Sequence, residues 1–510
     1  MDYALLMVFV LPTIAVPFVY FAGKKSAKMA ALLVAAIALV NIGMILTTVP
    51  TIMNSVDHRY IESYRWIPVL NAEFTLFVDG ISCSIAIISL ILIIAAALFS
   101  VNYMEGKKNL PVYYVLMSLL SVGLVGVFIT SNLLLFYFCW ELMLVPAYFI
   151  VGNWGYRESY RAAFKLFIFT HAGAVFVLLG IGSIYMATHG LTDIFQAQQA
   201  LMNASPNLLR WILVALTAGF AVKMAVVPVH MWLPDAHSEA PATMSALLSG
   251  VIISAGAYAI LRLSLGTVFP AVMSLDSGFG VAFVHGLAIF GVISAFFGSL
   301  IALVETDIKR IIAYSSIAHM GYVMFGLSLF PSHPLAGGTV AITAAITGTV
   351  LHLINHAVSK GLFFLSAGAV MHQTEVRDVN EMGGLAGKMP FTTVNSAIAA
   401  LSIAGTPPFA CFISEFLIFV GAFEVIKTDG FFILPTALML VATVLSLAYS
   451  LRFVSKVFLG QSKNGAEGEK KIVDVPNYMK LAMVLLVIFV ILLGIYPTFF
   501  VHLINTVSFG

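Results

Sequence analysis

Residues 220–241 read FAVKMAVVPVHMWLPDAHSEAP and place Lys223 inside an apolar stretch long enough to enter a lipid bilayer. A charge near the middle of a membrane helix costs about 2.5–3.5 kcal/mol on insertion scales, so it persists only where it faces partners or water inside the protein. Pro228, Pro234 and Pro241 follow closely. Because proline removes a backbone donor and clashes with the preceding turn, the segment predicts a broken membrane helix.

The composition of the whole chain agrees with a membrane location. Of 510 residues, 61% are hydrophobic and 9% are charged, against about 25% charged in ordinary soluble domains. The net charge of +2 gives no support to nucleic-acid binding. Three separated cysteines, Cys83, Cys139 and Cys411, form no metal-ligand or disulfide pattern. We expect no metal and no cofactor bound by this chain, and we interpret the run 3–22 as a retained first helix.

Hydrophobic runs predict an all-α polytopic membrane protein with about fourteen transmembrane helices. Most of the 25 basic residues then lie on one side, which the positive-inside rule assigns to the inner face, with both termini outside. The other side holds only Arg59, Arg65, Arg210, Arg262 and Lys427. The predicted spans are 3–22, 29–49, 79–102, 112–130, 132–152, 161–188, 208–230, 242–266, 280–303, 308–330, 338–369, 391–424, 431–458 and 477–503.

A second break and a weak internal repeat suggest two related halves. The stretch SIAGTPPFACFISEF, residues 402–416, carries Pro407 and Pro408 just before Glu415. Segment 164–173 resembles segment 359–368, with lysine, aromatic residues and glycine in register. We expect five-helix repeats, the second running through the membrane in the opposite direction, with breaks in helices 7 and 12. The predicted divisions are 1–111 for helices 1–3, 112–266 and 280–458 for the repeats, and 459–510 for helix 14.

Glu141 and Lys223 are the first pair of candidate transport residues. Glu141 lies near the middle of its span, and a carboxylate there needs a cationic partner. Lys223 lies at similar depth and can release a proton when buried, which arginine effectively cannot. We expect an ion pair whose strength depends on the protonation of neighbouring groups. The alternatives are a neutral hydrogen-bonded acid and a lysine that snorkels to an interface.

A polar stripe is expected on helix 11. His352, His356 and Lys360 recur at intervals of four residues, so they share one helix face. A lone membrane histidine is usually a hydrogen-bonded packing residue, but three titratable groups on one stripe favour a proton relay, for which histidine titrates nearest neutrality. His319 on helix 10 is a further candidate.

Two more charged residues complete the candidate set. Glu415, after the second break, would end the polar path, whereas Lys165 serves either transport or snorkelling to an interface. Metal ligation by the segment 235–239 is less favoured than a structural loop bracketed by prolines. The segment 305–310 is interpreted as a charge cluster at the membrane boundary. Neither GxxxxGK[ST] nor GxGxxG occurs, so energy is expected from an ion gradient or from partner subunits.

The segments FYFCWELMLVPAYFIVGNWG, FAVKMAVVPVHMWLPDAHSEAP, TDIKRIIAYSSIAHMGYV and DVNEMGGLAGKMP resemble signature blocks of the antiporter-like proton-pumping subunits of respiratory complex I, closest to the NuoM (chain 4) type. The wider family includes Mrp-type Na+/H+ antiporters and membrane-bound hydrogenases. The resemblance implies fourteen helices, inverted repeats at helices 4–8 and 9–13, and broken helices 7 and 12.

The resemblance also implies site residues. Glu141 and Lys223 match the glutamate–lysine pair of helices 5 and 7, and Glu415 matches the glutamate of broken helix 12. His319 and His356 match histidines of the central polar axis. This chain departs from the family pattern at Ser254, where NuoM-type chains generally carry a central lysine. Lys360 is more typical of the NuoL and Mrp branches, so the central carrier is either Lys360 or a more histidine-based route.

The implied function is proton translocation by a membrane-arm subunit of a complex-I-like oxidoreductase. Flavin, iron–sulfur clusters and a quinone or phenazine are expected in partner subunits, which comprise NuoL-, NuoN- and NuoK-like chains and a peripheral redox arm. An archaeal reduced-deazaflavin dehydrogenase is favoured over a bacterial NADH enzyme. The alternatives are a subunit of an Mrp-type Na+/H+ antiporter or of a membrane-bound hydrogenase, and a structural spacer that seals the lipid.

Overall fold

The computed structural model describes residues 3–330, 339–461 and 472–507, with the side chains of 339–343 left aside. Its elements in chain order are α1 (Ala4–Ile14), α2 (Val16–Lys25), α3 (Ala27–Asn54), β1 (Tyr60–Ile67), η1 (Pro68–Leu70), β2 (Ala72–Val78), α4 (Gly80–Tyr103), α5 (Leu110–Ile129), α6 (Leu133–Trp154), α7 (Ser159–Ala187), α8 (Ile194–Leu201), α9 (Pro206–Met224), α10 (Leu233–Glu239), α11 (Ala242–Leu247), η2 (Leu248–Ile252), α12 (Ile253–Ala259), η3 (Ile260–Val268), α13 (Phe269–Leu275), α14 (Ser277–Val304), α15 (Ile308–Ser328), α16 (Thr339–Thr374), η4 (Leu385–Gly387), α17 (Pro390–Ile403), α18 (Ala410–Ile426), η5 (Gly430–Phe432), α19 (Ile433–Phe458), α20 (Asn477–Ile495) and α21 (Thr498–Asn505).

The helices form a membrane-spanning bundle. Within the described residues, 13 helices are long and apolar enough to cross a membrane. The predicted span 391–424 is instead two shorter helices, α17 and α18, which separate at Pro407 and Pro408. Taken as one crossing, this pair completes the fourteen spans expected from the sequence. All-helical membrane architecture is therefore confirmed.

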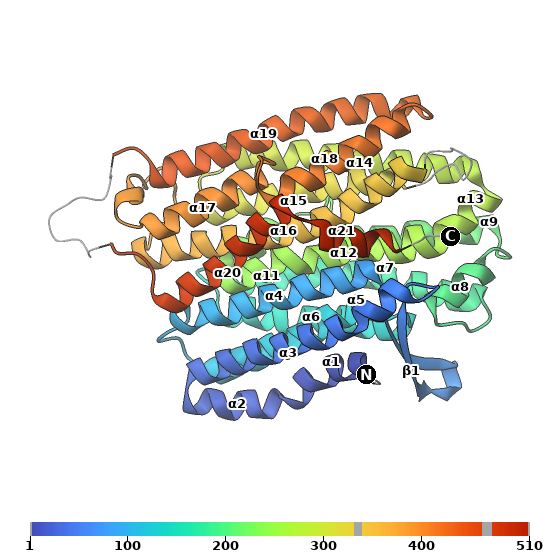
Figure 1. Ribbon diagram of the computed structural model, residues 1–510, viewed down its shortest axis with the longest axis horizontal. Helices are drawn as coiled ribbons and strands as arrows, with labels where there is room; N and C mark the ends of the chain where they lie inside the picture. The colour runs from blue at the N-terminus through green and yellow to red at the C-terminus, as the bar shows by residue number, and fades with distance from the viewer. Residues whose placement is uncertain (1–2, 331–338, 462–471, 508–510) are drawn as a thin grey trace.

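The two chain termini lie at the same end of the bundle, as an even number of crossings requires (Figure 1). We call this the terminal end. The opposite end, called the basic end below, carries the α2–α3 and α4–α5 connections with Lys24, Lys25, Lys28, Lys107 and Lys108.

The two broken helices run in opposite directions. Helix α9 lies towards the terminal end and α11, which follows α10, towards the basic end, whereas α17 lies at the basic end and α18 continues towards the terminal end (Figure 1). The breaks fall after Lys223 and before Glu415, as the prolines predicted. Opposite directions agree with an inverted arrangement, while the limits 112–266 and 280–458 of the two repeats stay a prediction.

Two features were not anticipated from the sequence. The eighth span, 242–275, contains π-helical segments η2 and η3 within an otherwise α-helical rod. Between α3 and α4, β1 and β2 pair antiparallel as a hairpin at the terminal end. Its turn residue Asn71 has a left-handed backbone with φ 49°, which asparagine tolerates better than most residues. The sequence before the strands carries no turn pattern strong enough to predict this hairpin.

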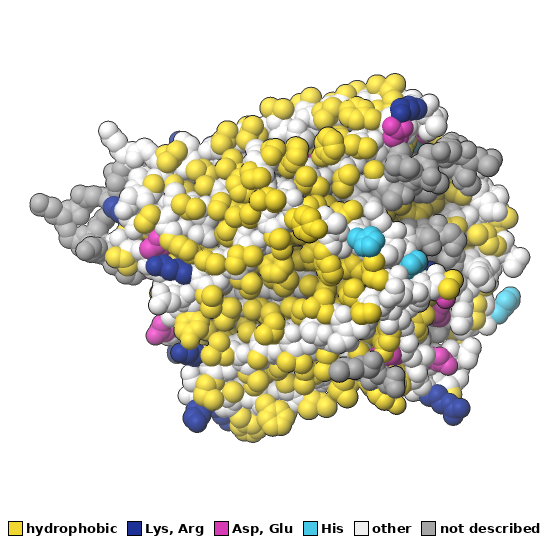
Figure 2. Space-filling model, viewed as in Figure 1, with side chains coloured by type: hydrophobic (Ala, Val, Ile, Leu, Met, Phe, Trp, Pro, Cys, Tyr) yellow, Lys and Arg dark blue, Asp and Glu magenta, His cyan; other side chains and the backbone are white. Residues whose placement is uncertain are grey.

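The surface matches a lipid environment. Figure 2 shows hydrophobic side chains over the middle of the visible face, with most charged side chains towards the two ends. Many large apolar residues are exposed on the long helices, among them Leu39, Phe176, Leu300 and Val444. Such exposure would be costly in water and is expected against acyl chains.

Arg262, which the sequence placed on the outer side, is buried beside the start of α4. Its guanidinium is 5% exposed and forms an ion pair with Asp79, which is 1% exposed. Asp79 also caps α4 by accepting hydrogen bonds from the backbone N–H groups of Ile81 and Ser82. This buried pair therefore ties the start of α4 to η3.

Candidate functional site

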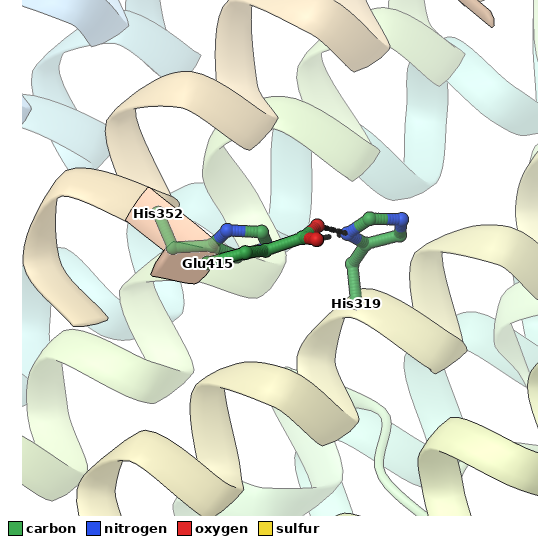
Figure 3. Close-up of side chains that lie close together, drawn as sticks. All are labelled: His319, His352 and Glu415. Atoms are coloured by element: carbon green, nitrogen blue, oxygen red, sulfur yellow. Dashed lines mark hydrogen bonds and ion pairs between the residues drawn. The ribbon is translucent and has the colours of Figure 1, made fainter. Parts of the chain in front are cut away.

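Two histidines and a glutamate meet inside the second half of the bundle. His319 Nδ1 lies 3.1 Å from His352 Nε2 and 3.9 Å from Glu415 Oε1 (Figure 3). The side chains come from α15, α16 and α18, and all three residues are at most 6% exposed. The structure thus brings together three residues that the sequence singled out on separate helices.

The remaining nitrogens of the two histidines also have partners. His352 Nδ1 lies 3.0 Å from Ser414 Oγ, and His319 Nε2 lies 3.2 Å from the hydroxyl of Tyr449. Ser446 Oγ is 2.7 Å from the same hydroxyl. Hydroxyl groups donate and accept, so each can accommodate either tautomer of its histidine. Glu415 Oε1, in contrast, has no hydrogen-bond partner in the described structure.

Gly405 sets the space around Glu415. It has a left-handed backbone, φ +65°, and a Cβ at this position would overlap Glu415 Oε2. Helix α17 ends at Ile403, and the chain turns through Gly405 before α18 begins. The glycine in AGTPP is therefore required both by its conformation and by the approach of the carboxylate.

Replacing Gly405 with alanine is expected to displace Glu415 and to slow ion translocation. The left-handed conformation alone costs about 1–2 kcal/mol for a residue with a Cβ, and the Glu415 carboxylate must also shift to relieve the overlap with the new Cβ. Vesicle assays of the assembled protein would measure the change. Gly43→Ala is the matched control, because a Cβ there meets nothing within 4 Å. Equal rates in both variants would contradict the assigned role of Gly405.

Lys360 and His356 continue the stripe on α16. The Lys360 ammonium is fully buried and donates to Ser315 Oγ and to the carbonyl of Ile312, the latter at 3.2 Å. Both ring nitrogens of His356 are buried without a partner in the described structure. The His356 ring lies 5.6 Å from that of His319, centroid to centroid. The expected polar stripe is therefore present and faces the protein interior.

The expected direct ion pair between Glu141 and Lys223 is absent from the described residues. Lys223 Nζ donates to the carbonyl of Trp140 at 2.9 Å and lies 3.9 Å from the centroid of its ring. Glu141 Oε2 instead lies 3.2 Å from His171 Nδ1. Successive residues of a helix point about 100° apart. Trp140 therefore faces the core, whereas the Glu141 carboxylate lies nearer the protein surface.

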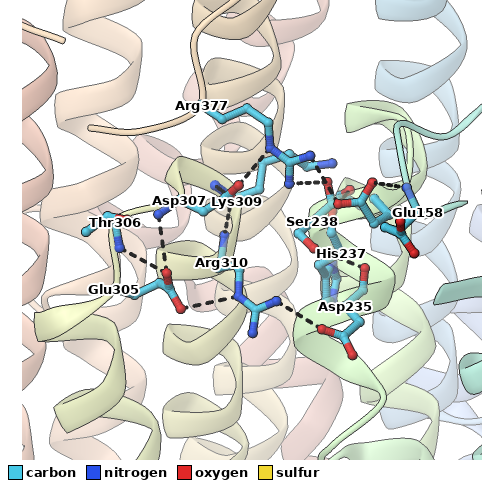
Figure 4. Close-up of polar contacts among 12 residues, drawn as sticks. Glu158, Asp235, His237, Ser238, Glu305, Thr306, Asp307, Lys309, Arg310 and Arg377 are labelled. Carbon is cyan, nitrogen blue, oxygen red and sulfur yellow. Dashed lines mark hydrogen bonds and ion pairs between the residues drawn. The ribbon is translucent and has the colours of Figure 1, made fainter. Parts of the chain in front are cut away.

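Lys165 belongs to a different cluster, at the basic end of the bundle. Its Nζ lies 2.6 Å from Asp235 Oδ2. Arg310 binds the other oxygen of that carboxylate at 2.9 Å (Figure 4). Two groups of ion pairs lie there: one joins Lys165, Asp235, Arg310 and Glu305, and the other joins Glu239, Arg377 and Asp307. We call them together the basic-end network. None of the described contacts joins Lys165 to Lys223 or to Lys360. Asp235 and Glu239, expected in a loop, lie on the short helix α10.

Comparison with known proteins places this geometry in a family. A family model described as NADH:quinone oxidoreductase/Mrp antiporter, transmembrane, matches residues 130–446, which include the residues of both broken helices and of the buried histidines. The chain belongs to this family.

Curated relatives refine the assignment within the antiporter family. NADH-quinone oxidoreductase subunit M of Rickettsia conorii is 32% identical over 449 residues, covering 86% of this chain and 83% of the relative. F(420)H(2) dehydrogenase subunit M of Methanosarcina mazei is 30% identical over 446 residues, with 86% and 84% covered. Within the family, the chain is an M-type, antiporter-like membrane subunit.

Solved structures share the fold at lower identity. Respiratory complex I from Thermus thermophilus contains a chain with a TM-score of 0.81 and 21% identity, covering 98% of this chain and 97% of that one. The Mrp complex from Dietzia sp. gives 0.83 and 20%, with 99% and 97% covered. The antiporter-like fold expected from the sequence is thereby confirmed.

Ser254 stands where the resemblance implies a lysine, so helix 8 has no charged side chain at its centre. Ser254 Oγ donates to the carbonyl of Gly250 in its own helix. A Cβ on Gly250 would lie 3.1 Å from the carbonyl oxygen of Ala357, so helix 8 packs closely on α16 near Lys360. Among the described residues, no hydrogen bond links Lys223 and its partner Trp140 to Lys360 and its partner Ser315. The titratable groups therefore form two clusters, separated by helix 8.

The trio His319, His352 and Glu415 offers ligand atoms within 4.8 Å of one another, a spacing that could hold a metal ion. The 3.1 Å between His319 Nδ1 and His352 Nε2 also fits a hydrogen bond, in which one of the two nitrogens carries a proton.

Sequence reasoning missed several partners of the predicted residues. Lys223 contacts Trp140, and Glu141 contacts His171. Lys360 contacts Ser315, and His319 contacts Tyr449. Of these, only His171 carried a usable signal, since it is a titratable residue in an otherwise apolar span. The other three are residue types that pack in any membrane helix, so their roles depend on tertiary contacts.

Proposed function

We propose that this chain translocates protons as a membrane-arm subunit of a complex-I-like oxidoreductase. The observation that carries the proposal is the buried hydrogen-bonded contact between His352 and His319 beside Glu415. Imidazole groups exchange protons near neutrality, and the burial of the site keeps that exchange away from bulk water.

Protons are better suited than sodium ions to this site. The groups lining it are mainly lysine and histidine nitrogens, while hard cations favour several oxygen ligands. Neutral His352 accepts a proton either from Lys360 or from His356, its neighbour on α16. Passing it along the hydrogen bond to His319 brings it next to Glu415, and from there it leaves towards the terminal end. Each transfer returns the donor to its starting protonation state.

The first cluster acts as the electrostatic control. Lys223 has no carboxylate within ion-pair distance in the described structure, but the charge of Glu141 acts on it across Trp140. Protonation of Glu141 would remove that attraction, and protonation of His171 would offset it. Either event changes the free energy of the charge on Lys223. Because charges interact strongly in a medium of low dielectric constant, this change reaches the stripe on α16.

Redox chemistry belongs to partner subunits in this proposal. Flavin, iron–sulfur clusters and a quinone or phenazine would lie there, and NuoL-, NuoN- and NuoK-like chains would flank this subunit. The excess of lysine at the basic end supports a prokaryotic cell-membrane orientation with both termini outside. The M-type relatives include subunits of NADH and F420H2 enzymes. Both electron donors are therefore tried in the experiment below.

Membrane vesicles that contain the native assembly provide that test. NADH or reduced F420 is added, and acidification of the vesicle interior is followed in sodium-free and sodium-containing buffer. Acidification with one donor, independent of sodium, supports the proposal. Sodium uptake without a redox donor would instead assign the chain to an Mrp-type antiporter.

Lys223→Ala is expected to abolish proton translocation while the complex still assembles. The variant removes the charge on which Glu141 acts, yet leaves the contacts of Trp140 with Phe136 and Phe220 in place. The number of protons moved per electron is the measurement. Lys427→Ala is the matched control, because that lysine is 66% exposed and pairs with Glu424 on the surface. An unchanged proton stoichiometry in Lys223→Ala would remove the residue from the mechanism.

A further inference from the structure

Lys309 is a buried lysine that the sequence assigned only to a boundary charge cluster. It is 0% exposed, and its ammonium donates to the carbonyl of Ala240. The only aromatic ring described beside it is that of Tyr156, with the ammonium 5.3 Å from the centroid. None of the described carboxylates lies within 4.0 Å of its Nζ. Nearby Asp307 and Glu239 are ion-paired with Arg377 instead.

His237 is a second buried group without a defined task. It is 0% exposed, and both of its ring nitrogens lack a hydrogen-bond partner in the described structure. Its ring stacks on Phe364 at 4.8 Å, and Phe364 lies one helical turn beyond Lys360 on α16. The positive charges of Lys309 and Lys360 both act on the His237 ring. Ala240, which accepts the hydrogen bond of Lys309, ends the short helix that carries His237, and Phe364 shares a face of α16 with Lys360, so the fold places His237 near both lysines.

A polar cavity at the basic end is lined by residues next to Lys309 and His237 in sequence, although neither group lines it itself. The cavity has a volume of about 260 Å³, and its lining includes Lys165, Asp235, Glu239 and Arg310. Lys309 neighbours Arg310 in sequence, and its acceptor Ala240 directly follows Glu239. Asp235 and Glu239 line the cavity from the short helix α10. Figure 4 shows Asp235 and His237 on that helix.

We propose that Lys309 and His237 form the inlet through which protons pass from this cavity to Lys360. The inference rests on the proposed function and adds to it the inner half of the path. A neutral Lys309 takes a proton from water in the cavity and gives it to neutral His237. The imidazolium then gives it to neutral Lys360, and both donors return to their uncharged state.

The surroundings of Lys309 suit such a role. Burial, assisted by the hydrogen-bonded phenol of Tyr103, raises the pKa of Tyr156, so its ring remains neutral. Arg377, 5.6 Å from the same ring centroid, keeps its positive charge. Asp307 and Glu239 attract the Lys309 ammonium but are paired with Arg377, so no described carboxylate forms an ion pair with it. Its proton can therefore be released without breaking an ion pair.

Three variants test the inlet in vesicles that carry the native assembly. Lys309→Arg keeps the charge, the hydrogen bond and the aromatic contact but cannot release a proton; Lys309→Met and His237→Gln remove titration altogether. Each is expected to lower the initial rate of proton translocation by at least about tenfold at unchanged assembly. Lys456→Arg, an exposed lysine at the same end, is the matched control. A parental rate in Lys309→Arg or in His237→Gln overturns the inlet.

Reference variants separate failure of the inlet from failure of the proposed function. If Lys360→Met and Glu415→Gln are inactive while Lys309→Arg and His237→Gln keep the parental rate, only the inlet is overturned. If all four variants translocate normally, the proposed function is overturned as well.

A labelling experiment decides the matter where a variant fails to assemble. His237→Cys is treated with 2-aminoethyl methanethiosulfonate from the basic-end side, with the parent, whose three cysteines are buried, as background. Modification of the introduced thiol supports a wet inlet, and its absence overturns it.

Discussion

Lys360→Met is expected to stop proton translocation and to leave the stability of the protein unchanged or higher. The ammonium is fully buried and is held by Ser315 and a backbone carbonyl, with no carboxylate among its described contacts. Replacing a buried charge by an apolar side chain of similar length is often neutral or stabilising. If Lys360 only held helices together, its replacement would instead lower the stability of the protein and leave translocation by the assembled protein intact.

Lys360→Arg distinguishes charge from proton transfer at the same position. Arginine retains the positive charge and can donate to Ser315, but its proton is not released. We expect both variants to lower the rate of translocation by about 10²-fold or more, the scale typical of a lost proton-transfer group. The rate is measured in vesicles together with the amount of assembled chain. Full activity in Lys360→Arg would mean that only the charge matters.

The sequence predicted the spans and the buried charges well because both depend on the cost of polar groups in lipid. Lys223, Lys360 and Glu415 stand out in apolar runs, and prolines mark both breaks. The structure confirms the spans and brings His319, His352 and Glu415 together.

Contacts that depend on helix rotation and on packing could not be predicted in the same way. The expected pairing of Glu141 with Lys223 was wrong. The position of a residue in its span indicates its depth in the membrane, but not the direction about the helix axis in which its side chain points. His237 was assigned to a loop because prolines bracket it, yet the short helix α10 turns it towards Phe364. Neighbours from distant spans decide such orientations.

Breaking the Arg262–Asp79 pair is expected to cause the largest loss of stability in the chain. Both side chains are almost fully buried. Removing one partner leaves the other charge uncompensated in a medium of low dielectric constant, which typically costs about 3–5 kcal/mol. Arg262→Met should therefore reduce the amount of folded protein and lower the temperature of unfolding in detergent. Its rate of translocation per assembled complex should remain near that of the parent.

The double variant Arg262→Met with Asp79→Asn makes this prediction specific to the pair. Asparagine can still cap α4 by accepting the N–H groups of Ile81 and Ser82, while the double change leaves no unpaired charge. We expect it to recover much of the stability lost in Arg262→Met, since the two sites are in contact and their effects are not additive. Arg210→Met is the matched control, because that arginine is 46% exposed in its ion pair with Asp276. An additive loss in the double variant would show that Arg262 and Asp79 stabilise the fold through separate contacts, such as the rings of Phe77 and Tyr258 beside the guanidinium.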